Sequence, residues 1–506
     1  MIWFFLLILI SVVALLFNFL RPRPIPKGLQ KVPIEKGFPL IGILPLLTFP
    51  ILEYYERLIK KHGPVFGMKM GLRTIFVLND YRAIRNALID NKDNFSGRWR
   101  LFQSLLGTQN AGIVSTDGDQ THIHRRFIIK VMHEFGMGTL RSLTNIQTEC
   151  TALLECLEKC QGERIQVSDI IPTYMANIIT KFLMNKTFSV GDPKLNLIKN
   201  ILTEIARTKD IFQFLYFTLP ILDRFPRVCD FLMSFTTRKD LFNKVHRILQ
   251  QEIEEHRKTF DVKNEGEDLI DRFLMKQDQL KSSEESVKSF TDFQLVRHLL
   301  ELFLAGYETT STIFHWSLFF MSKYQEIQSK VHQEIIDSIG TERLPTNNDR
   351  KDLTYTTAVM DEILRLSSVL PLALIHRTTN DTEVNSYFIP KDSLVLINLY
   401  ACHVDPNVWE KPREFYPEHF LSPKENGNIK YVPKDQLNPF GMGKRQCIGE
   451  SLGRMQYFIF FVSILQRFQV SFADPVTESQ FQEALRANEG IVRYPSINEF
   501  VFNRIQ

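Results

Sequence analysis

The sequence predicts a mainly helical globular protein with a smaller β-rich part near its N-terminus, preceded by a transmembrane helix. Residues 140–281 show the pattern of successive amphipathic helices. A long apolar helix follows, which begins after Thr291 and extends to Lys323. Near the N-terminus, two short apolar runs, Val65–Met70 and Thr74–Leu78, flank a glycine-containing turn and predict a β-hairpin. Helices therefore account for most of the chain.

The chain is long enough for a large buried core. It has 506 residues, of which 44% are hydrophobic, and its formal net charge is +4. No glycine- and serine-rich linker, repeat or low-complexity tract divides it, which favours one large globular unit. The small net charge, without a basic stripe interleaved with aromatic residues, argues against a nucleic-acid-binding protein.

The first twenty residues predict a membrane anchor. Residues 2–20 are almost wholly apolar and are interrupted only by Ser11 and Asn18. At about 1.5 Å per residue, a helix of this length spans roughly 28 Å, close to the hydrocarbon thickness of a bilayer. A cleaved signal peptide is the alternative, but no positive charge precedes the run and no small-x-small site ends it.

Positive charges and prolines follow the apolar run. The charges favour a body on the cytoplasmic side of the membrane, and the prolines predict a stiff, extended spacer. We therefore divide the chain into an anchor at 1–20, a proline-rich spacer at 21–37 and one large domain at 38–506. The residues concerned are Arg21, Pro22, Arg23, Pro24, Pro26 and Lys27.

The six cysteines lack the paired spacing of a zinc site. In a reduced, cytosolic body we expect no structural disulfide. The cysteines are Cys150, Cys156, Cys160, Cys229, Cys402 and Cys447.

One stretch combines a cysteine with residues suited to a large anionic metal cofactor. Phe440, Gly443, Arg445, Cys447 and Gly449 form the pattern F-x-x-G-x-R-x-C-x-G. Thiolate is the metal-binding form of cysteine, and nearby glycines let backbone N–H groups approach the sulfur. The arginine suits a carboxylate on the cofactor rim, the phenylalanine could shield the sulfur from water, and a helix predicted just beyond points its positive end at the thiolate. An isolated cysteine is more often an ordinary buried one, so the whole pattern carries the prediction.

This pattern resembles the haem-binding signature of the cytochrome P450 superfamily, with no mismatch. The resemblance implies haem b as cofactor and metal centre, with the Cys447 thiolate as its axial iron ligand. It also implies the cytochrome P450 fold, mainly helical with a smaller β-rich subdomain, from about Pro33 to the C-terminus. The haem would lie between the helix that carries Thr309 and the Cys447 loop.

The long helix carries a polar motif, Ala305-Gly306-Tyr307-Glu308-Thr309-Thr310. A glycine within a helix costs about 1 kcal/mol relative to alanine, and a carboxylate and hydroxyls among apolar residues are costly unless paired. A local bend with threonine bonded to the preceding turn explains the glycine and threonine, but not the glutamate. The motif is similar to the superfamily pattern at every position. That similarity implies that Gly306 opens a groove for dioxygen, Thr309 supplies a catalytic hydroxyl there and Glu308 relays protons.

A second pair supports the same resemblance. Glu362 and Arg365 stand at i and i+3 on one predicted helix face, which is worth only a few tenths of a kcal/mol when exposed. Downstream, Pro417-Glu418-His419-Phe420 resembles the superfamily element that completes a buried triad with this pair, with His419 in place of arginine. This variant resembles animal microsomal members, and it assigns the three residues to folding and haem loading.

The resemblance further implies which residues contact the haem propionates. They are Arg98, Arg125 and His376, with Arg377 as the alternative to the histidine. A solvated surface position is the ordinary alternative for each of them. The superfamily usually has tryptophan four residues before the second of these arginines, whereas this chain has Thr121.

The aromatic-rich segment 211–225, around Pro220, has two interpretations. Burial in the core is the default for such a patch. The resemblance suggests instead a lid that dips into the membrane over the substrate channel. Farther along, the apolar run Val369–Ile375 should line the pocket wall.

Together these features imply a haem-thiolate monooxygenase of the animal microsomal type, with a single span in the endoplasmic reticulum membrane and its catalytic domain on the cytoplasmic side. It would insert one oxygen atom of O₂ into an apolar organic molecule of the steroid, fatty acid or xenobiotic class. Electrons would come from NADPH through a separate flavoprotein reductase, since the chain shows no flavin domain. Cytochrome b5 is a further candidate donor, and membrane lipid a further partner.

Two alternatives remain at this point. One is a haem-thiolate isomerase or dehydratase of the same fold, which needs no reductase; the intact Glu308-Thr309 pair argues against it. The other is a non-enzymatic haem-binding protein, against which thiolate ligation beside an oxygen groove argues.

Overall fold

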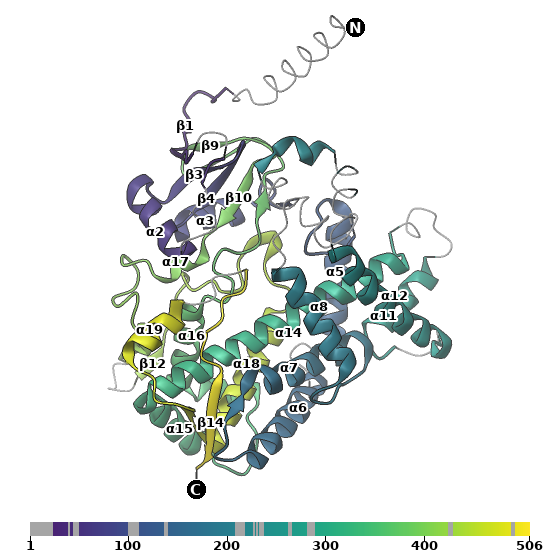
Figure 1. The fold of residues 1–506 in the computed structure, drawn as a ribbon, viewed down its shortest axis with the longest axis vertical. Helices are drawn as coiled ribbons and strands as arrows, with labels where there is room; N and C mark the ends of the chain where they lie inside the picture. Colours follow the sequence, from purple (N-terminus) through teal and green to yellow (C-terminus); the bar gives the residue numbers. More distant parts are fainter. Residues whose placement is uncertain are drawn as a thin grey trace, which may run out of the picture.

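The computed structural model describes most of the chain. The described residues are 24–38, 41–43, 50–99, 111–135, 140–207, 218–225, 228, 231, 237–261, 266–280, 289–423, 429–486 and 491–505. Helices form the larger part of them, and the longer strands of the N-terminal region gather at one end with segments from far along the chain (Figure 1). The predicted mainly helical fold with a smaller β-rich subdomain is confirmed.

The helices lie close to their predicted positions. A helix precedes the hairpin, and the described part of residues 140–281 contains five α-helices. In chain order the helices are α2 (Ile51–His62), α3 (Tyr81–Arg85), α5 (Asp119–Glu134), α6 (Leu140–Lys159), α7 (Val167–Met184), α8 (Pro193–Arg207), α11 (Thr237–Thr259), α12 (Leu269–Gln279), α14 (Asp292–Lys323), α15 (Gln325–Ile339), α16 (Thr354–Ser367), α17 (Leu399–His403), α18 (Glu450–Arg467) and α19 (Glu478–Arg486).

The largest sheet joins the predicted hairpin to strands from the second half of the chain. Its order is β2 (Ile34–Glu35), β3 (Val65–Met70), β4 (Arg73–Leu78), β10 (Leu394–Ile397), β7 (His376–Arg377) and β5 (Gly97–Arg98). The hairpin β3–β4 is antiparallel, as predicted, and β4 pairs with β10 in parallel. The antiparallel pairing of β5 with β7 brings two predicted propionate contacts together, since Arg98 lies directly opposite His376.

Three smaller sheets complete the β-structure of the described residues. One contains β1 (Gln30–Lys31), β9 (Tyr387–Ile389) and β8 (Thr382–Val384); another contains β13 (Phe468–Phe472), β14 (Glu499–Arg504) and β6 (Ile165–Gln166); the third pairs β11 (Leu421–Pro423) with β12 (Ile429–Tyr431).

The predicted spacer differs from the structure in its second half. Strands β1 and β2 fall within residues 21–37, and they pair with β9 and β3. The body therefore begins before Phe38, because the chain gains backbone hydrogen bonds there instead of continuing as a free extended linker. Residues 1–20, the predicted anchor, lie outside the described residues. Among the described residues, no helix is long and apolar enough to cross a membrane.

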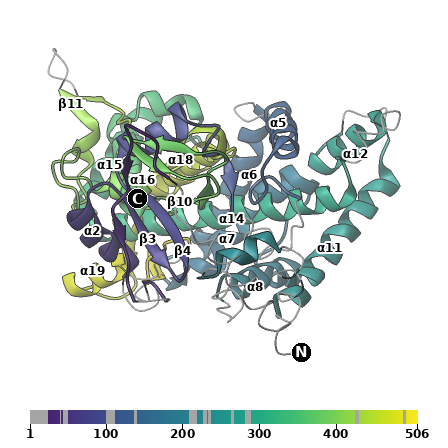
Figure 2. The same ribbon diagram turned by 90° about the horizontal axis from the view of Figure 1, so that it is seen from above.

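Helix α14 runs across the molecule between the sheet end and the α11–α12 arm (Figure 2). Its N-terminal half packs with Leu299 and Phe303 in one apolar cluster, and its C-terminal half packs with Phe314 and Trp316 in another. Thr291 caps it by accepting a hydrogen bond of 3.2 Å from the backbone N–H of Gln294. One helix thus carries the polar motif through both cores.

The predicted buried triad is confirmed. Arg365 donates two hydrogen bonds to Glu362, from Nε at 2.8 Å and from Nη2 at 2.7 Å, and both side chains are fully buried. His419 donates from Nδ1 to Glu362 at 3.3 Å, because its Nε2 accepts from the backbone N–H of Lys411. Arg365 also donates to three backbone carbonyls between 403 and 414, so the triad fixes the segment that leads to the cysteine loop.

We predict that Glu362→Ala destabilises the protein severely, because it leaves the Arg365 guanidinium buried without its carboxylate. Breaking a buried ion pair from one side costs about 3–5 kcal/mol. Urea denaturation of the haem-loaded protein measures the loss. The control is Lys130→Ala, which removes an exposed partner of Glu134 and should cost under about 1 kcal/mol. Equal effects of the two variants would refute a structural role for the triad.

Candidate functional site

The predicted cysteine loop is a tight turn that ends at α18. The backbone N–H of Cys447 donates to the carbonyl of Phe440 at 3.0 Å, which closes the loop. Cys447 is exposed, whereas most of α18 beyond its first turn is buried. The surrounding protein still raises the pKa of its thiol by desolvation, and the Gly449 N–H and the Arg125 charge oppose that rise. Since α18 begins at Glu450, its N-terminus follows the sulfur directly, as predicted.

The two glycines of the motif have different roles. A Cβ at Gly449 would lie 3.9 Å from the Cys447 sulfur, so this backbone does approach the thiol. A Cβ at Gly443 would lie 2.0 Å from the carbonyl oxygen of Leu88, and its φ is +75°. Gly443 therefore admits the close approach of the segment that follows α3, and its contact with the cofactor stays a prediction.

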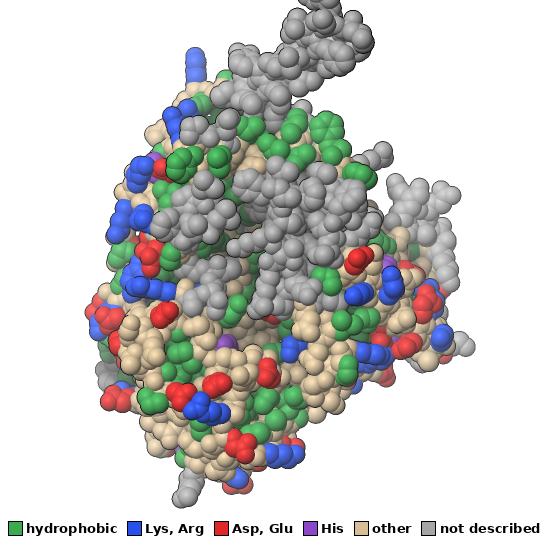
Figure 3. Space-filling model, in the orientation of Figure 1, with side chains coloured by type: hydrophobic (Ala, Val, Ile, Leu, Met, Phe, Trp, Pro, Cys, Tyr) green, Lys and Arg blue, Asp and Glu red, His purple; other side chains and the backbone are tan. Residues whose placement is uncertain are grey.

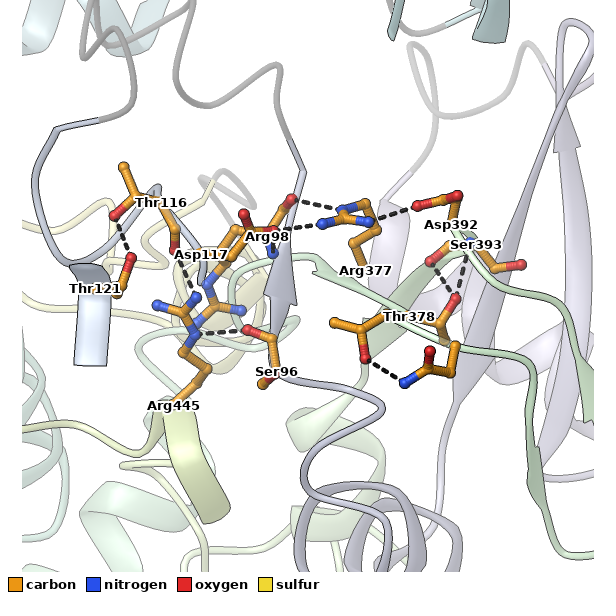
Figure 4. A network of polar contacts seen from close by, with 12 residues as sticks. Ser96, Arg98, Thr116, Asp117, Thr121, Arg377, Thr378, Asp392, Ser393 and Arg445 are labelled. Atoms are coloured by element: carbon orange, nitrogen blue, oxygen red, sulfur yellow. Dashed lines mark hydrogen bonds and ion pairs between the residues drawn. The ribbon is translucent and has the colours of Figure 1, made fainter. Parts of the chain in front are cut away.

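Three predicted cofactor-binding arginines lie close enough for their charges to interact, and all donate to backbone carbonyls. Figure 4 shows two of them, Arg98 and Arg445. Arg445 donates to Ser96 at 2.8 Å, to Ile113 at 3.2 Å and to Thr116 at 2.5 Å. Arg98 donates to the carbonyls of Val114 at 3.2 Å and Leu374 at 3.1 Å. Arg125, from α5, donates to the carbonyl of Gln446 at 2.7 Å, next to the cysteine.

These guanidinium groups lack matching negative charge within the described part of the chain. No ion pair joins Arg98, Arg125 or Arg445 to a described carboxylate; Asp117, whose charge acts on Arg98 and Arg445, is paired with Arg377 at 2.6 Å. Burial first, and then mutual repulsion, lowers the pKa of Arg445 to about 10 and that of Arg98 well below its usual range. A cofactor with two carboxylates, such as haem, fits this cluster of unbalanced cations.

His376 joins the cluster, and its predicted alternative Arg377 does not. His376 is buried, and its Nδ1 donates to the carbonyl of Phe95 at 2.7 Å. Burial, and then the charge of Arg98, lowers its pKa well below the usual range, so its Nε2 is an acceptor until a carboxylate beside it favours protonation. Arg377 forms ion pairs with Asp117 at 2.6 Å and Asp392 at 2.5 Å, which already occupy its guanidinium.

The polar motif of α14 presents one face to an open space. Ala305 is exposed, although the helix around it is largely buried. Thr309 donates from Oγ1 to the carbonyl of Ala305 at 2.7 Å, so the bond to the preceding turn is present. Its oxygen retains lone pairs, and the hydroxyl can donate elsewhere only after releasing this carbonyl. The exposed Ala305 and the partly exposed Thr309 therefore lie on a face of α14 that a ligand can reach.

Two neighbours of Thr309 point elsewhere. A Cβ at Gly306 would lie 2.9 Å from Ile179 of α7, so this glycine allows the two helices to approach, and the oxygen groove expected beside it stays a prediction. Glu308 is partly exposed and opposes the desolvation of Lys199 on α8 by raising the pKa of that ammonium group. Its carboxylate therefore lies toward the outer side of α14.

Sequence reasoning missed a stripe of buried polar residues on α14, which lies one to three turns before Ala305. Gln294, His298 and Glu301 are all buried and stand at i, i+4 and i+7, which places them on one face. Polar residues at helical spacing in an otherwise apolar helix were the available signal. Thr121, where the superfamily usually has tryptophan, is also buried, and its hydroxyl pairs with that of Thr116 at 2.8 Å.

We predict an acid-sensitive stability that depends on His124. Its Nε2 donates to the Ser289 hydroxyl at 3.0 Å, and burial lowers its pKa from 6.5 to about 4. Between these values the unfolded chain binds a proton that the native state excludes, so stability is full above about pH 6.5 and is lost as the pH falls toward 4. In urea denaturation across this range, His124→Gln should show a slope smaller by up to about one proton. The exposed His133→Gln on the same helix is the control, and an unchanged slope in His124→Gln would contradict the prediction.

Comparison with known proteins agrees with this geometry. A family described as "Cytochrome P450" matches residues 32–497. The chain is similar to cytochrome P450 2C20 of Macaca fascicularis, with 33% identity over 99% of this chain and 99% of the relative. It is similar to cytochrome P450 2E1 of Rattus norvegicus, with 32% identity over 94% and 92%, and to cytochrome P450 2B4 of Oryctolagus cuniculus, with 33% identity over 93% of each.

Proposed function

Because the chain belongs to the cytochrome P450 family, we propose that it is a membrane-anchored monooxygenase in which Cys447 binds the haem iron and Thr309 and Glu308 manage protons. The enzyme is an oxidoreductase of the cytochrome P450 type, and its cofactor is haem b with a cysteine thiolate as axial ligand. The observation that carries the assignment of residues is the cluster of one buried and two partly buried arginines, none ion-paired with a described carboxylate, beside an exposed cysteine.

Each residue of the cluster would hold one part of the haem. Cys447 supplies the thiolate, and the Gly449 N–H and the α18 N-terminus stabilise its charge. Arg98, Arg125 and Arg445 bind the two propionates, and His376 donates to them once protonated. Phe440 lies under the guanidinium of Arg454 at 4.7 Å and covers the loop on that side. When bound, haem supplies the iron at which dioxygen is reduced.

Thr309 and Glu308 would both contribute to proton transfer, from different sides of α14. Glu308, partly exposed and near Lys199, exchanges protons with solvent. Thr309 holds a hydroxyl on the cofactor face, and release from the Ala305 carbonyl lets that hydroxyl donate to a substrate or to water in the site. A hydroxyl that can donate to either of two acceptors is suited to holding a proton in place by hydrogen bonding rather than to releasing one.

We infer the electron donor and the substrate class from the same family membership. Electrons would come from NADPH through a separate flavoprotein reductase, with cytochrome b5 as a further candidate donor. The substrate would be an apolar organic molecule of the steroid, fatty acid or xenobiotic class, since the partly buried Leu372 and Ile375 belong to an apolar cluster beside the arginine site.

Exposed apolar side chains support membrane association in the endoplasmic reticulum, with residues 1–20 as the single-pass anchor and the catalytic domain on the cytoplasmic side. Phe38, Phe225 and Phe231 are more than half exposed, at 61%, 52% and 62%. The β3–β4 turn connects their segments, since Gly71 donates to the carbonyl of Ile41 and Leu72 to that of Thr218. Apolar side chains gather at the upper part of the face in Figure 3. Residues 211–217 of the predicted lid lie outside the described part.

We predict that Cys447→Ala loses the red-shifted Soret band of the reduced carbonyl complex, because no thiolate remains for the iron. Absorption spectra of the reduced protein with carbon monoxide measure this. Cys402→Ala, which removes a fully buried thiol elsewhere, is the control and should keep the band. A Cys447→Ala protein that retained the band would show that another residue is the ligand.

We predict that Thr309→Ala separates NADPH consumption from product formation. Positioned proton transfer contributes about 10²–10⁴-fold, so substrate oxidation should fall while oxygen is still reduced and released as hydrogen peroxide. The measurement is the ratio of product to NADPH consumed, with added reductase, beside the melting temperature. Thr310→Ala is the matched control, because it loses the same kind of bond, 2.7 Å to the Gly306 carbonyl. If both variants only lower the melting temperature, the hydroxyl is structural.

We predict that the exposed phenylalanines bind lipid. In a protein that lacks residues 1–20, Phe225→Asp with Phe231→Asp should lower co-sedimentation with phospholipid vesicles, because charge opposes burial in the interface. Ile429→Asp, at an exposed apolar position on β12, serves as the control. Unchanged sedimentation of the double variant would place the membrane contact elsewhere.

A further inference from the structure

Glu301 is a buried carboxylate that the proposed reaction does not use. It lies on α14 one turn before Ala305, is 3% exposed, and has no ion-pair partner within the described part of the chain. A buried carboxylate is costly unless hydrogen bonds satisfy it. Its role therefore depends on which groups donate to it.

All of its hydrogen-bond donors come from one short loop. Its Oε2 accepts from the backbone N–H groups of Ile113 at 2.6 Å and Val114 at 2.9 Å, and its Oε1 accepts from the Ser115 hydroxyl at 2.8 Å. The loop backbone also leaves room for the carboxylate to approach at Gly112. Gly112 has a φ of +101°, and a Cβ there would lie 2.5 Å from both carboxylate oxygens.

The carbonyls of the same loop face the arginine cluster. Ile113 accepts from Arg445 at 3.2 Å, and Val114 accepts from Arg98 at 3.2 Å. The two loop residues are therefore held through their N–H groups by Glu301 and through their carbonyls by a guanidinium. Thr116, at the end of the loop, gives Arg445 a further acceptor at 2.5 Å.

The other polar residues of the stripe support the same loop. The Gln294 amide donates to the carbonyl of Gly112 at 3.4 Å and to Nε2 of His298 at 3.1 Å. The hydroxyls of Thr116 and Thr121 pair at the C-terminal end of the loop, where Thr116 also donates to the carbonyl of Gly112 at 2.8 Å.

We propose that Glu301 is a positioning residue for the haem carboxylates: it fixes the loop 111–117 by its backbone N–H groups, and the loop in turn fixes the guanidinium groups of Arg445 and Arg98. The inference rests on the proposed haem site. Because the loop contributes carbonyls, it orients the arginines without neutralising them. Burial raises the pKa of the Glu301 carboxyl, and the hydrogen bonds from Ile113, Val114 and Ser115 oppose this rise.

The test is haem retention, measured as transfer of haem to an excess of apomyoglobin. Glu301→Ala should lose haem about 10–100-fold faster than the wild type, the usual effect of removing a residue that orients a ligand. Glu301→Gln should come much closer to the wild type, because its oxygen can accept both N–H groups and its amide can donate to Ser115. Hydrogen exchange at 112–115 should accelerate in the alanine variant alone. Ser317→Ala, at a buried hydroxyl on the same helix, is the stability control.

A double-mutant cycle tests whether Glu301 acts through the loop. Arg445→Lys should accelerate haem loss in the wild type and have much less effect in Glu301→Ala, because the arginine is no longer held. Arg125→Lys is the matched control: that arginine is bound to Gln446 and not to the loop, so its effect should be unchanged by Glu301→Ala. Additive effects with both arginines, or normal haem retention in Glu301→Ala, would overturn the proposal while leaving the Cys447 assignment intact.

Discussion

Burying the guanidinium groups of Arg98, Arg125 and Arg445 near one another costs free energy through desolvation and through repulsion between like charges. The structure offsets part of this cost with backbone carbonyls from Ser96, Ile113, Val114 and other positions, which contribute hydrogen bonds but no negative charge. The positive charge that remains is therefore available to an anionic cofactor. The β5–β7 pairing, the loop before α5 and the start of α18 are all arranged around it.

Arg365 shows the contrasting solution within the same chain. Its guanidinium is neutralised by Glu362 and then bound by three carbonyls, so nothing remains for a ligand. Both kinds of site use carbonyls to fix a planar cation in place. The presence or absence of a carboxylate distinguishes the structural arginine from the cofactor-binding ones, and that distinction is made by charge rather than by burial.

The sequence predicts the local features of this arrangement well, and the long-range ones poorly. The hairpin β3–β4, the cap at Thr291 and the Glu362–Arg365 pair depend on residues close in sequence, where periodicity and spacing are informative. The parallel pairing of β4 with β10 and the strand character of Gln30–Lys31 depend on segments hundreds of residues away. No local pattern encodes such pairings.

The same division applies to the glycines at the site. Gly306 and Gly443 lie in motifs that predict a role at the cofactor, and Ile179 and the Leu88 carbonyl lie where a Cβ of either glycine would stand. A motif specifies that a side chain is absent, but only the fold shows which neighbour requires its absence. Glu301 presents the reverse case: outside any motif, it accepts hydrogen bonds from the loop that orients Arg445. Residues that act through backbone atoms leave little trace in sequence patterns, because the peptide groups they bind are the same for every residue type.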